Sequence, residues 1–271
     1  MKSQELSLRE VQLSCLEIMR AFDTFCRENN LTYYLAGGTM LGAIRHKGFI
    51  PWDDDVDLMM PRADYERMMT LNFSHERFRF YSLKTDPEYT RPWVRIVDTF
   101  TEQFSQVYFK GDTKAVFIDI APIDGLPVSY RATKWHYVRQ RILDAFNKGA
   151  KRNYIEEKER LALLKRLAQK VFGQKGARKF AIRIDKNAQK WPFETSTYRG
   201  VSVVYHYGVR EKLPANVFDS TIYVDFEDMK VPLFAGYEHY LKNIYGDYMQ
   251  LPPEEKRVVP HRDHFRWVEG K

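Results

Sequence analysis

The chain has 271 residues, of which 44% are hydrophobic and 29% charged, so it can bury a sizeable core in one large domain or in a domain with a smaller addition. No run of about 18 apolar residues predicts a transmembrane helix, and the polar N-terminus is not typical of a signal peptide, so we expect a cytoplasmic protein. The two cysteines, Cys15 and Cys26, are roughly 16 Å apart in one predicted helix, too far for a disulfide, and no zinc-ligand spacing occurs.

Helices and short strands alternate in the first part of the chain. Residues 7–29 predict an amphipathic helix in which Ser7 and Glu10 form a capping box. The predicted elements that follow are a strand at 31–36, a helix at 40–46, a strand around 55–59, a helix at 62–71, strands at 78–83, 93–98, 106–109 and 116–120, a turn at 122–125, helices within 131–190 and further strands from about residue 201. This order predicts an α+β or mixed α/β fold.

The net charge of +7 is unevenly distributed along the chain. Residues 131–195 contain 18 Lys and Arg but 6 Asp and Glu, a net of +12, which leaves −5 for the rest. Such a segment predicts an anionic partner: a lipid surface, nucleic acid or a charged polymer. An apolar stripe from Leu161 to Phe172 lies among these basic residues. It predicts either peripheral contact with an anionic membrane through residues 158–190 or a helical subdomain that packs its stripe on the core.

Residues 53–58 read Asp-Asp-Asp-Val-Asp-Leu and carry the strongest chemical signal. If residues 55–58 form a strand, Asp55 and Asp57 point to the same face, and Asp53 joins them if the extended conformation reaches back. Carboxylates this crowded repel one another unless a cation neutralises them, and their oxygens suit Mg²⁺. The alternative is a solvated acidic turn, but the alternation with apolar residues favours the metal site.

Asp119 lies in a second alternating segment, Phe117-Ile118-Asp119-Ile120-Ala121. A single aspartate in an apolar strand needs a partner or a metal. The alternatives are a core aspartate with a hydrogen-bonding partner and a helix cap; we predict a further metal-binding carboxylate. Asp124 is interpreted as a turn residue.

Gly37-Gly38-Thr39 follows a short strand and opens a helix. This arrangement presents backbone N–H groups and a hydroxyl to a phosphate, and the glycines allow the ligand to approach closely. Arg45 and Lys47 are candidates for further phosphate contacts. For both, the alternative is a solvated helix end, where cations are favoured.

The segment from Leu35 to Asp57 resembles the LicD family of bacterial phosphocholine transferases, and it is similar to fukutin-related protein, an animal ribitol-phosphate transferase. Later matches are residues 117–120, 245–249 and 251–253, and the resemblance extends from Val11 to His261. It implies a nucleotidyltransferase-type α+β fold, a mixed sheet flanked by helices with a basic helical insertion. We therefore expect a catalytic core at 1–130, the basic insertion at 131–195, and a C-terminal part at 196–271 that completes the catalytic domain.

The resemblance also implies the reaction. CDP-choline would donate phosphocholine to a sugar hydroxyl of a lipid-linked, teichoic-acid-like glycopolymer precursor and release CMP. One or two Mg²⁺ ions, or Mn²⁺ in their place, would be held by Asp53, Asp55, Asp57 and Asp119. Asp55, Asp57 and Asp119 would act in catalysis, with Asp119 our candidate for the proton acceptor. Gly37, Gly38 and Thr39 would bind the nucleotide phosphates.

Choline carries a quaternary ammonium, which aromatic faces bind, and Trp52 and Trp93 are the candidates we name for it. Three alternatives remain: the same chemistry with CDP-linked ribitol, glycerol or ethanolamine phosphate; a nucleotidyltransferase acting on RNA or a small molecule; and a non-catalytic binding module. We do not expect nucleic acid as a partner, because no recognised RNA-binding motif accompanies the basic segment.

Overall fold

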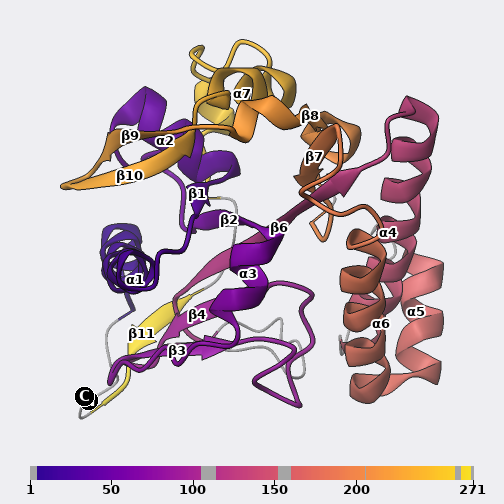
Figure 1. Ribbon diagram of the computed structural model, residues 1–271. Helices are drawn as coiled ribbons and strands as arrows, with labels where there is room; N and C mark the ends of the chain where they lie inside the picture. The colour runs from indigo at the N-terminus through magenta and orange to yellow at the C-terminus, as the bar shows by residue number, and fades with distance from the viewer. Residues whose placement is uncertain (1–4, 105–113, 152–159, 205, 260–263, 270–271) are drawn as a thin grey trace.

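The computed structural model describes residues 5–104, 114–151, 160–204, 206–259 and 264–269 (Figure 1). Its helices are α1 (Leu8–Glu28), α2 (Gly37–His46), α3 (Arg62–Met68), α4 (Tyr130–Lys151), α5 (Ala162–Val171), α6 (Gly173–Ala188) and α7 (Tyr237–Tyr245). Its strands are β1 (Tyr34–Leu35), β2 (Asp57–Pro61), β3 (Phe78–Tyr81), β4 (Val94–Asp98), β5 (Thr101–Gln103), β6 (Phe117–Leu126), β7 (Tyr198–Val201), β8 (Leu213–Pro214), β9 (Thr221–Phe226), β10 (Met229–Phe234) and β11 (Phe265–Trp267). Short 3-10 helices lie at Gly208–Glu211, Ala215–Phe218 and Glu254–Lys256.

The main sheet has the strand order β1-β2-β6-β4-β3, and β7 and β8 extend it along the second half of β6. β2 and β6 are parallel, and the other neighbours are antiparallel. The predicted α+β class with a mixed sheet flanked by helices is confirmed. β6 is the central strand, and β2, β4 and β7 all pair with it. The turn predicted at 122–125 is wrong, because β6 continues through these residues to Leu126.

Helix α1 packs on β4 and β6 and buries Cys15, Ile18 and Phe22. The predicted capping box at its start is confirmed. The backbone N–H of Glu10 donates to the Ser7 hydroxyl at 3.3 Å, and the Ser7 N–H donates to the Glu10 carboxylate at 2.7 Å. Both cysteines are free, as the sequence predicts, and both are buried.

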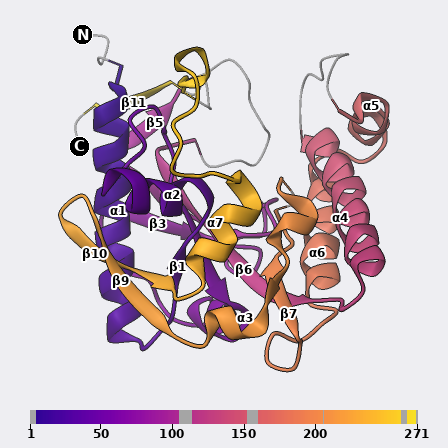
Figure 2. The ribbon, with the colours of Figure 1, turned by 90° about the horizontal axis from the view of Figure 1, so that it is seen from above.

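Helices α4, α5 and α6 stand together beside the sheet, and the chain then returns to it as β7 (Figures 1 and 2). The predicted basic segment therefore contains three helices, and its predicted boundary at 195 falls between α6 and β7. The strand predicted at 106–109 lies outside the described residues. None of the helices in the described part of the chain is long and apolar enough to cross a membrane.

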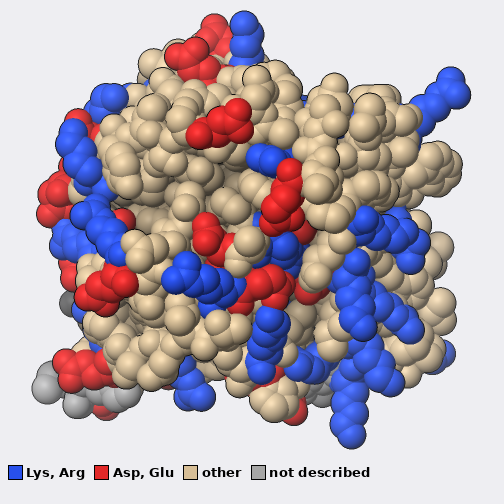
Figure 3. Space-filling model, viewed as in Figure 1, with Lys and Arg blue, Asp and Glu red and all other residues tan. Residues whose placement is uncertain are grey.

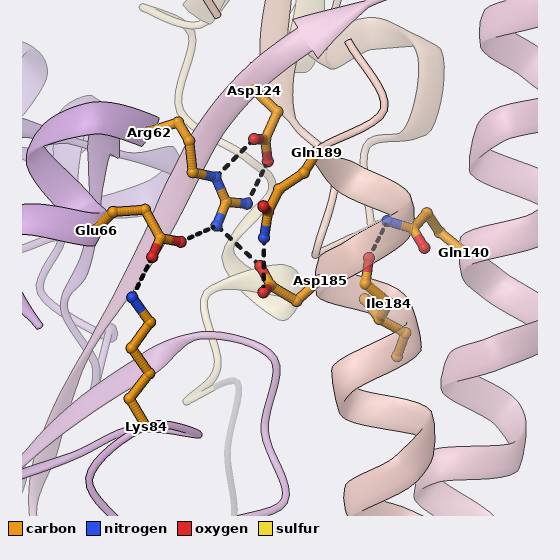
Figure 4. A network of polar contacts seen from close by, with 8 residues as sticks. All are labelled: Arg62, Glu66, Lys84, Asp124, Gln140, Ile184, Asp185 and Gln189. Atoms are coloured by element: carbon orange, nitrogen blue, oxygen red, sulfur yellow. Dashed lines mark hydrogen bonds and ion pairs between the residues drawn. The ribbon is translucent and has the colours of Figure 1, made fainter. Parts of the chain in front are cut away.

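A buried ion network connects α6 to the core (Figure 4). Arg62, the first residue of α3, donates from Nε and Nη2 to the two carboxylate oxygens of Asp124 on β6, each at 2.7 Å. Its Nη1 donates to Asp185 of α6 at 2.9 Å and to Glu66 at 3.1 Å. Asp124 is therefore a buried ion-pair partner rather than the turn residue predicted from its Pro/Gly surroundings.

Candidate active site

The segment that follows α2 turns back and runs along that helix. A Cβ atom at Gly42 would lie 2.5 Å from the carbonyl oxygen of Gly48 and 3.3 Å from the nitrogen of Ile50, and one at Gly38 would lie 2.8 Å from a carboxylate oxygen of Asp53. Gly38 and Gly42 are four residues apart and share one face of the helix. Because neither has a side chain, the returning backbone lies directly on α2 and brings Asp53 to the N-terminus of the helix.

We predict that Gly42→Ala destabilises the protein by about 1–3 kcal/mol and lowers turnover as well. The new methyl group meets backbone atoms, so the helix and the returning segment must separate. Alanine is otherwise the better helix former by about 1 kcal/mol, so a loss of stability reports the packing rather than helix propensity. Thermal unfolding and steady-state kinetics check this. Unchanged values in both would contradict the close packing.

The tip of the β9–β10 hairpin, at Glu227, contacts the start of the segment that follows α2. The Glu227 N–H donates to the Lys47 carbonyl at 2.7 Å, and the Phe49 N–H donates to the Glu227 carboxylate at 3.2 Å. Arg9 of α1 forms an ion pair with the second Glu227 oxygen at 2.6 Å. Residues 47–49 are therefore fixed between α1, α2 and the hairpin before the chain enters the acidic turn.

Asp53, Asp54 and Asp55 form the acidic turn. All three are half-buried, and each offers an oxygen that lies within 4.8 Å of the other two. β2 begins at Asp57 rather than at Asp55, although the Asp119 N–H donates to the Val56 carbonyl at 2.9 Å just before the strand. The segment ahead of the strand gathers three carboxylates and includes Asp54, which the strand argument omitted as a ligand. That Asp55 and Asp57 share a face stays a prediction.

Asp57 and Asp119 lie side by side in the sheet. They are register partners on the parallel strands β2 and β6, so their backbones are about 4.8 Å apart and their side chains leave the same face. A carboxylate oxygen of Asp57 would lie 3.9 Å from a Cβ atom at Gly37. The Asp57 N–H donates to the hydroxyl of Thr39 at 2.9 Å. The carboxylates of Asp53 and Asp57 thus both border the first turn of α2, the region predicted to bind phosphate.

Asp119 has a protein partner that sequence reasoning missed. Arg95, its register partner on β4, donates from Nε and Nη2 to the two Asp119 oxygens at 2.7 and 2.8 Å. Arg95 is 4% exposed, and its guanidinium lies 3.3 Å from the centre of the Phe117 ring. The signal was present, since Arg95 is a charged residue within an apolar strand and Asp119 required a partner. A carboxylate has about four lone-pair positions, so two hydrogen bonds leave coordination capacity on Asp119.

Arg95→Lys should lower turnover by about 10- to 100-fold, the usual cost of removing a group that orients a metal ligand. Lysine keeps the charge but not the planar fork that holds both Asp119 oxygens. Arg79→Lys on the neighbouring strand β3 is the matched control and should behave as the parent protein in the same kinetic assay. A full rate in Arg95→Lys would show that the orientation of Asp119 does not matter.

Three tyrosines line the same end of α2. The Tyr207 and Tyr245 hydroxyls are hydrogen-bonded at 2.7 Å, and both would lie within 3.8 Å of a Cβ atom at Gly37. The Tyr240 hydroxyl accepts the Gly37 N–H at 3.2 Å. Burial raises the pKa of Tyr207 to about 12, and the charges of Asp57 and Asp53 add to this despite the opposing bond from Tyr245. The resemblance includes residues 245–249, but the sequence did not predict that these tyrosines meet at Gly37, because they follow it by more than 160 positions.

Arg45 and Lys47 lie at or just after the last turn of α2, at the far end from Gly37. Arg45 donates to the backbone carbonyls of Tyr248 and Gln250 at 3.0 and 3.2 Å, so it holds the segment that follows α7. Lys47 is exposed and ends the helix in the left-handed conformation. The structure does not group these two side chains with Gly37–Thr39, and their contact with phosphate stays a prediction.

Trp52 and Trp93, the candidates for choline binding, are both half-buried. The Arg257 guanidinium lies 5.8 Å from the Trp52 ring centre, and that of Arg91 lies 5.5 Å from the Trp93 ring centre. A quaternary ammonium would have to share these rings with an arginine. The choline role of the two tryptophans stays a prediction.

Comparison with known proteins identifies the family of this chain. Residues 30–156 match the model of the LicD/FKTN/FKRP nucleotidyltransferase domain. The chain is 36% identical over 273 residues to the lipopolysaccharide cholinephosphotransferase LicD of Haemophilus influenzae, and the match covers 95% of this chain and 97% of that protein. The chain belongs to the LicD family. Uncharacterized proteins of Rickettsia prowazekii and Rickettsia typhi are each 40% identical over 52 residues, 19% of this chain.

In this LicD-family chain, the matched domain includes the Gly-Gly-Thr turn, the acidic turn, Arg95 and Asp119, whereas Tyr207 and Tyr245 lie beyond it. The donor set suits a hard divalent cation, because it consists of carboxylate oxygens gathered in a half-buried turn. Phosphate and carboxylate groups at the same helix end would repel each other, so a shared cation is the natural way to hold both there.

Proposed function

We propose that this LicD-family chain transfers phosphocholine from CDP-choline to a sugar hydroxyl of a glycan precursor and releases CMP, with Mg²⁺ as cofactor. The observation that supports this is that Asp53 of the acidic turn and Asp57 both border the N-terminus of α2, with Asp119 beside Asp57 in the sheet. The H. influenzae relative is a lipopolysaccharide cholinephosphotransferase, so its acceptor is a glycan. A teichoic-acid-like acceptor remains a prediction from the sequence.

The chain's own residues would position the donor. The backbone N–H groups of Gly38 and Thr39 in the first turn of α2, at the positive end of the helix dipole, would face the diphosphate, whereas the Gly37 N–H donates to Tyr240. The hydroxyls of Tyr207 and Tyr245 border that turn and would orient the donor. Asp53, Asp54, Asp55, Asp57 and Asp119 are the residues that would hold Mg²⁺. When bound, the ion would neutralise charge that develops on the departing CMP.

The reaction forms one bond and breaks one. The acceptor oxygen bonds to the choline-bearing phosphorus, and the bond from that phosphorus to the CMP oxygen breaks. The proton of the acceptor hydroxyl passes to a carboxylate of the site, for which Asp119 remains our candidate, and then to solvent. Little covalent chemistry by the protein is required, so positioning and charge compensation supply most of the rate.

A donor screen tests the proposal. The protein would be heated with CDP-choline, CDP-ethanolamine, CDP-glycerol, CDP-ribitol or a UDP-sugar, each with Mg²⁺ and with EDTA. A donor at 100 times its Kd should stabilise the fold by about 2.7 kcal/mol, and we expect this for CDP-choline with Mg²⁺. Release of CMP with a glycan acceptor, followed by mass spectrometry of the product, then identifies the transferred group.

Each other outcome has a definite meaning. Selective stabilisation by another CDP-linked donor would keep the chemistry and replace choline. Stabilisation by a UDP-sugar alone would reject the cytidine donor. Equal stabilisation with Mg²⁺ and with EDTA would reject the cation as the link between donor and carboxylates.

A further inference from the structure

Helix α5 carries an apolar face that the rest of the described chain does not cover. Leu163, Leu167 and Val171 are 81%, 51% and 60% exposed. They are spaced four residues apart and therefore form one stripe along the helix. The opposite side packs on α4 and buries Ala168. The alternative in which the stripe packs on the core holds at Ala168 but not at Leu167 and Val171.

Among the described residues, the charge around this face is almost entirely of one sign; Glu156, Glu157 and Glu159, in the connection between α4 and α5, lie outside the described residues. Figure 3 shows Lys and Arg concentrated over the part of the surface where α4, α5 and α6 lie in Figure 1. Exposed basic residues of these helices and their connections are Arg131, Lys134, Arg139, Arg160, Arg166, Lys170, Lys175, Lys179, Arg183, Lys186 and Lys190. In residues 130–151 and 160–190, the acidic residues are Asp144 and Asp185. Both are paired, with Lys148 at 3.1 Å and with Arg62 at 2.9 Å.

We propose that α5 is a docking surface for an anionic lipid bilayer, with Leu163, Leu167 and Val171 inserted among the lipids and the surrounding basic side chains on the headgroups. An exposed apolar stripe beside Lys170 and a strongly basic helical face is the pattern of a helix that lies in the plane of a membrane surface. This interface rests on the proposed function in one respect: a glycan acceptor attached to a lipid would be presented at such a surface.

Vesicle sedimentation tests the surface directly. The full chain would be mixed with phosphatidylglycerol-rich vesicles and with pure phosphatidylcholine vesicles, without donor or acceptor. We expect binding to the anionic vesicles that weakens as salt is raised, and little binding to the neutral ones. Leu163→Glu should weaken binding by at least about 10-fold, and Leu163→Glu/Leu167→Glu by at least about 100-fold, because each leucine loses its apolar insertion. Lys170→Glu should weaken it by about 30-fold.

The matched control is Tyr223→Glu on β9, which changes a side chain that is 61% exposed at a distant element. It should bind vesicles as the parent protein does. All of these substitutions replace exposed residues, so each variant should unfold at the same temperature as the parent protein. If Leu163→Glu lowers the unfolding temperature, Leu163→Gln would replace it in the binding assay.

Equal binding of the parent protein and the double variant would overturn the proposal, as would no binding of the parent protein to anionic vesicles. A dimer in solution that the double variant converts to a monomer, without vesicle binding, would instead assign the face to a second copy of the chain. The donor screen is independent of lipid. If the parent protein responds to donor but does not bind anionic vesicles, only the membrane surface is rejected. If it binds anionic vesicles but does not respond to any donor, only the proposed reaction is rejected.

Discussion

Asp57→Asn should lower kcat by at least about 1000-fold, equivalent to roughly 4 kcal/mol of transition-state stabilisation, while the fold remains intact. The substitution keeps the shape of the side chain and the hydrogen bond from the residue 57 N–H to Thr39. It removes one of the two carboxylates that lie side by side on β2 and β6. Initial rates with saturating donor and Mg²⁺ provide the measurement.

The stability of Asp57→Asn separates a metal-binding role from a structural one. In EDTA the variant should be as stable as the parent protein or more so, because it relieves repulsion between carboxylates. Mg²⁺ should stabilise the parent protein more than the variant, by mass action on the folded state. Asp228→Asn is the control, since Asp228 is an exposed carboxylate paired with Arg20 on α1. Rates near those of the parent protein in Asp57→Asn would remove the metal-site assignment.

Arg62→Met should destabilise the protein by about 3–5 kcal/mol at neutral pH. The substitution leaves the Asp124 side chain, which is 2% exposed, without its counter-charge and next to Asp185 and Glu66. Burial by itself lowers the pKa of Arg62, because it disfavours the charged guanidinium. The hydrogen bonds to Asp124 and the negative charge of Asp124 outweigh this effect, so the pKa of Arg62 is raised. Chemical denaturation of the two proteins measures the loss.

The penalty of Arg62→Met should shrink as the pH falls. Burial already raises the pKa of Asp124 above its ordinary value although Arg62 opposes this, and removal of Arg62 raises it further. A carboxyl whose folded pKa is raised favours folding below its unfolded pKa and loses that contribution as pH rises through the folded value. The variant should therefore be closer to the parent protein at pH 5 than at pH 8.

Two further variants complete the Arg62 test. Arg62→Met/Asp124→Leu should recover much of the stability, because an apolar pair can replace a buried ion pair. Arg67→Met, at an exposed position of the same helix, should change stability by less than about 0.5 kcal/mol. Equal unfolding free energies for Arg62→Met and Arg67→Met would show that the network contributes no stability.

The parts of the fold that the sequence predicts well are those set by local pattern. Helix α1 and its capping box, the strand at 94–98 and the helix after Gly37 follow from periodicity and capping chemistry within short windows. The strand predicted to start at Asp55 begins only at Asp57. The turn predicted at Asp124 is part of a strand, because Arg62 of α3 supplies the counter-charge with which Asp124 is buried in β6.

The sequence predicted most of the carboxylates of the candidate site, but not how they are positioned or which residues contact them. The pairing of Arg95 with Asp119 depends on the register of β4 against β6, which local sequence does not encode. The approach of Tyr207 and Tyr245 to Gly37 depends on where α7 docks. Such contacts between distant segments are set by tertiary packing, so a single sequence shows which residues need a partner but not which residue supplies it.

The hairpin tip at Glu227 has a consequence for biosynthesis. When about the first 200 residues have been synthesised, the nascent chain already contains all of the proposed carboxylates, but Glu227, which holds Lys47 and Phe49, has not yet been made. Tyr240 and Tyr245, which enclose Gly37, emerge later still. Cation affinity should therefore develop only near the end of translation, and a fragment that stops before Glu227 should carry the acidic turn without the frame that shapes it.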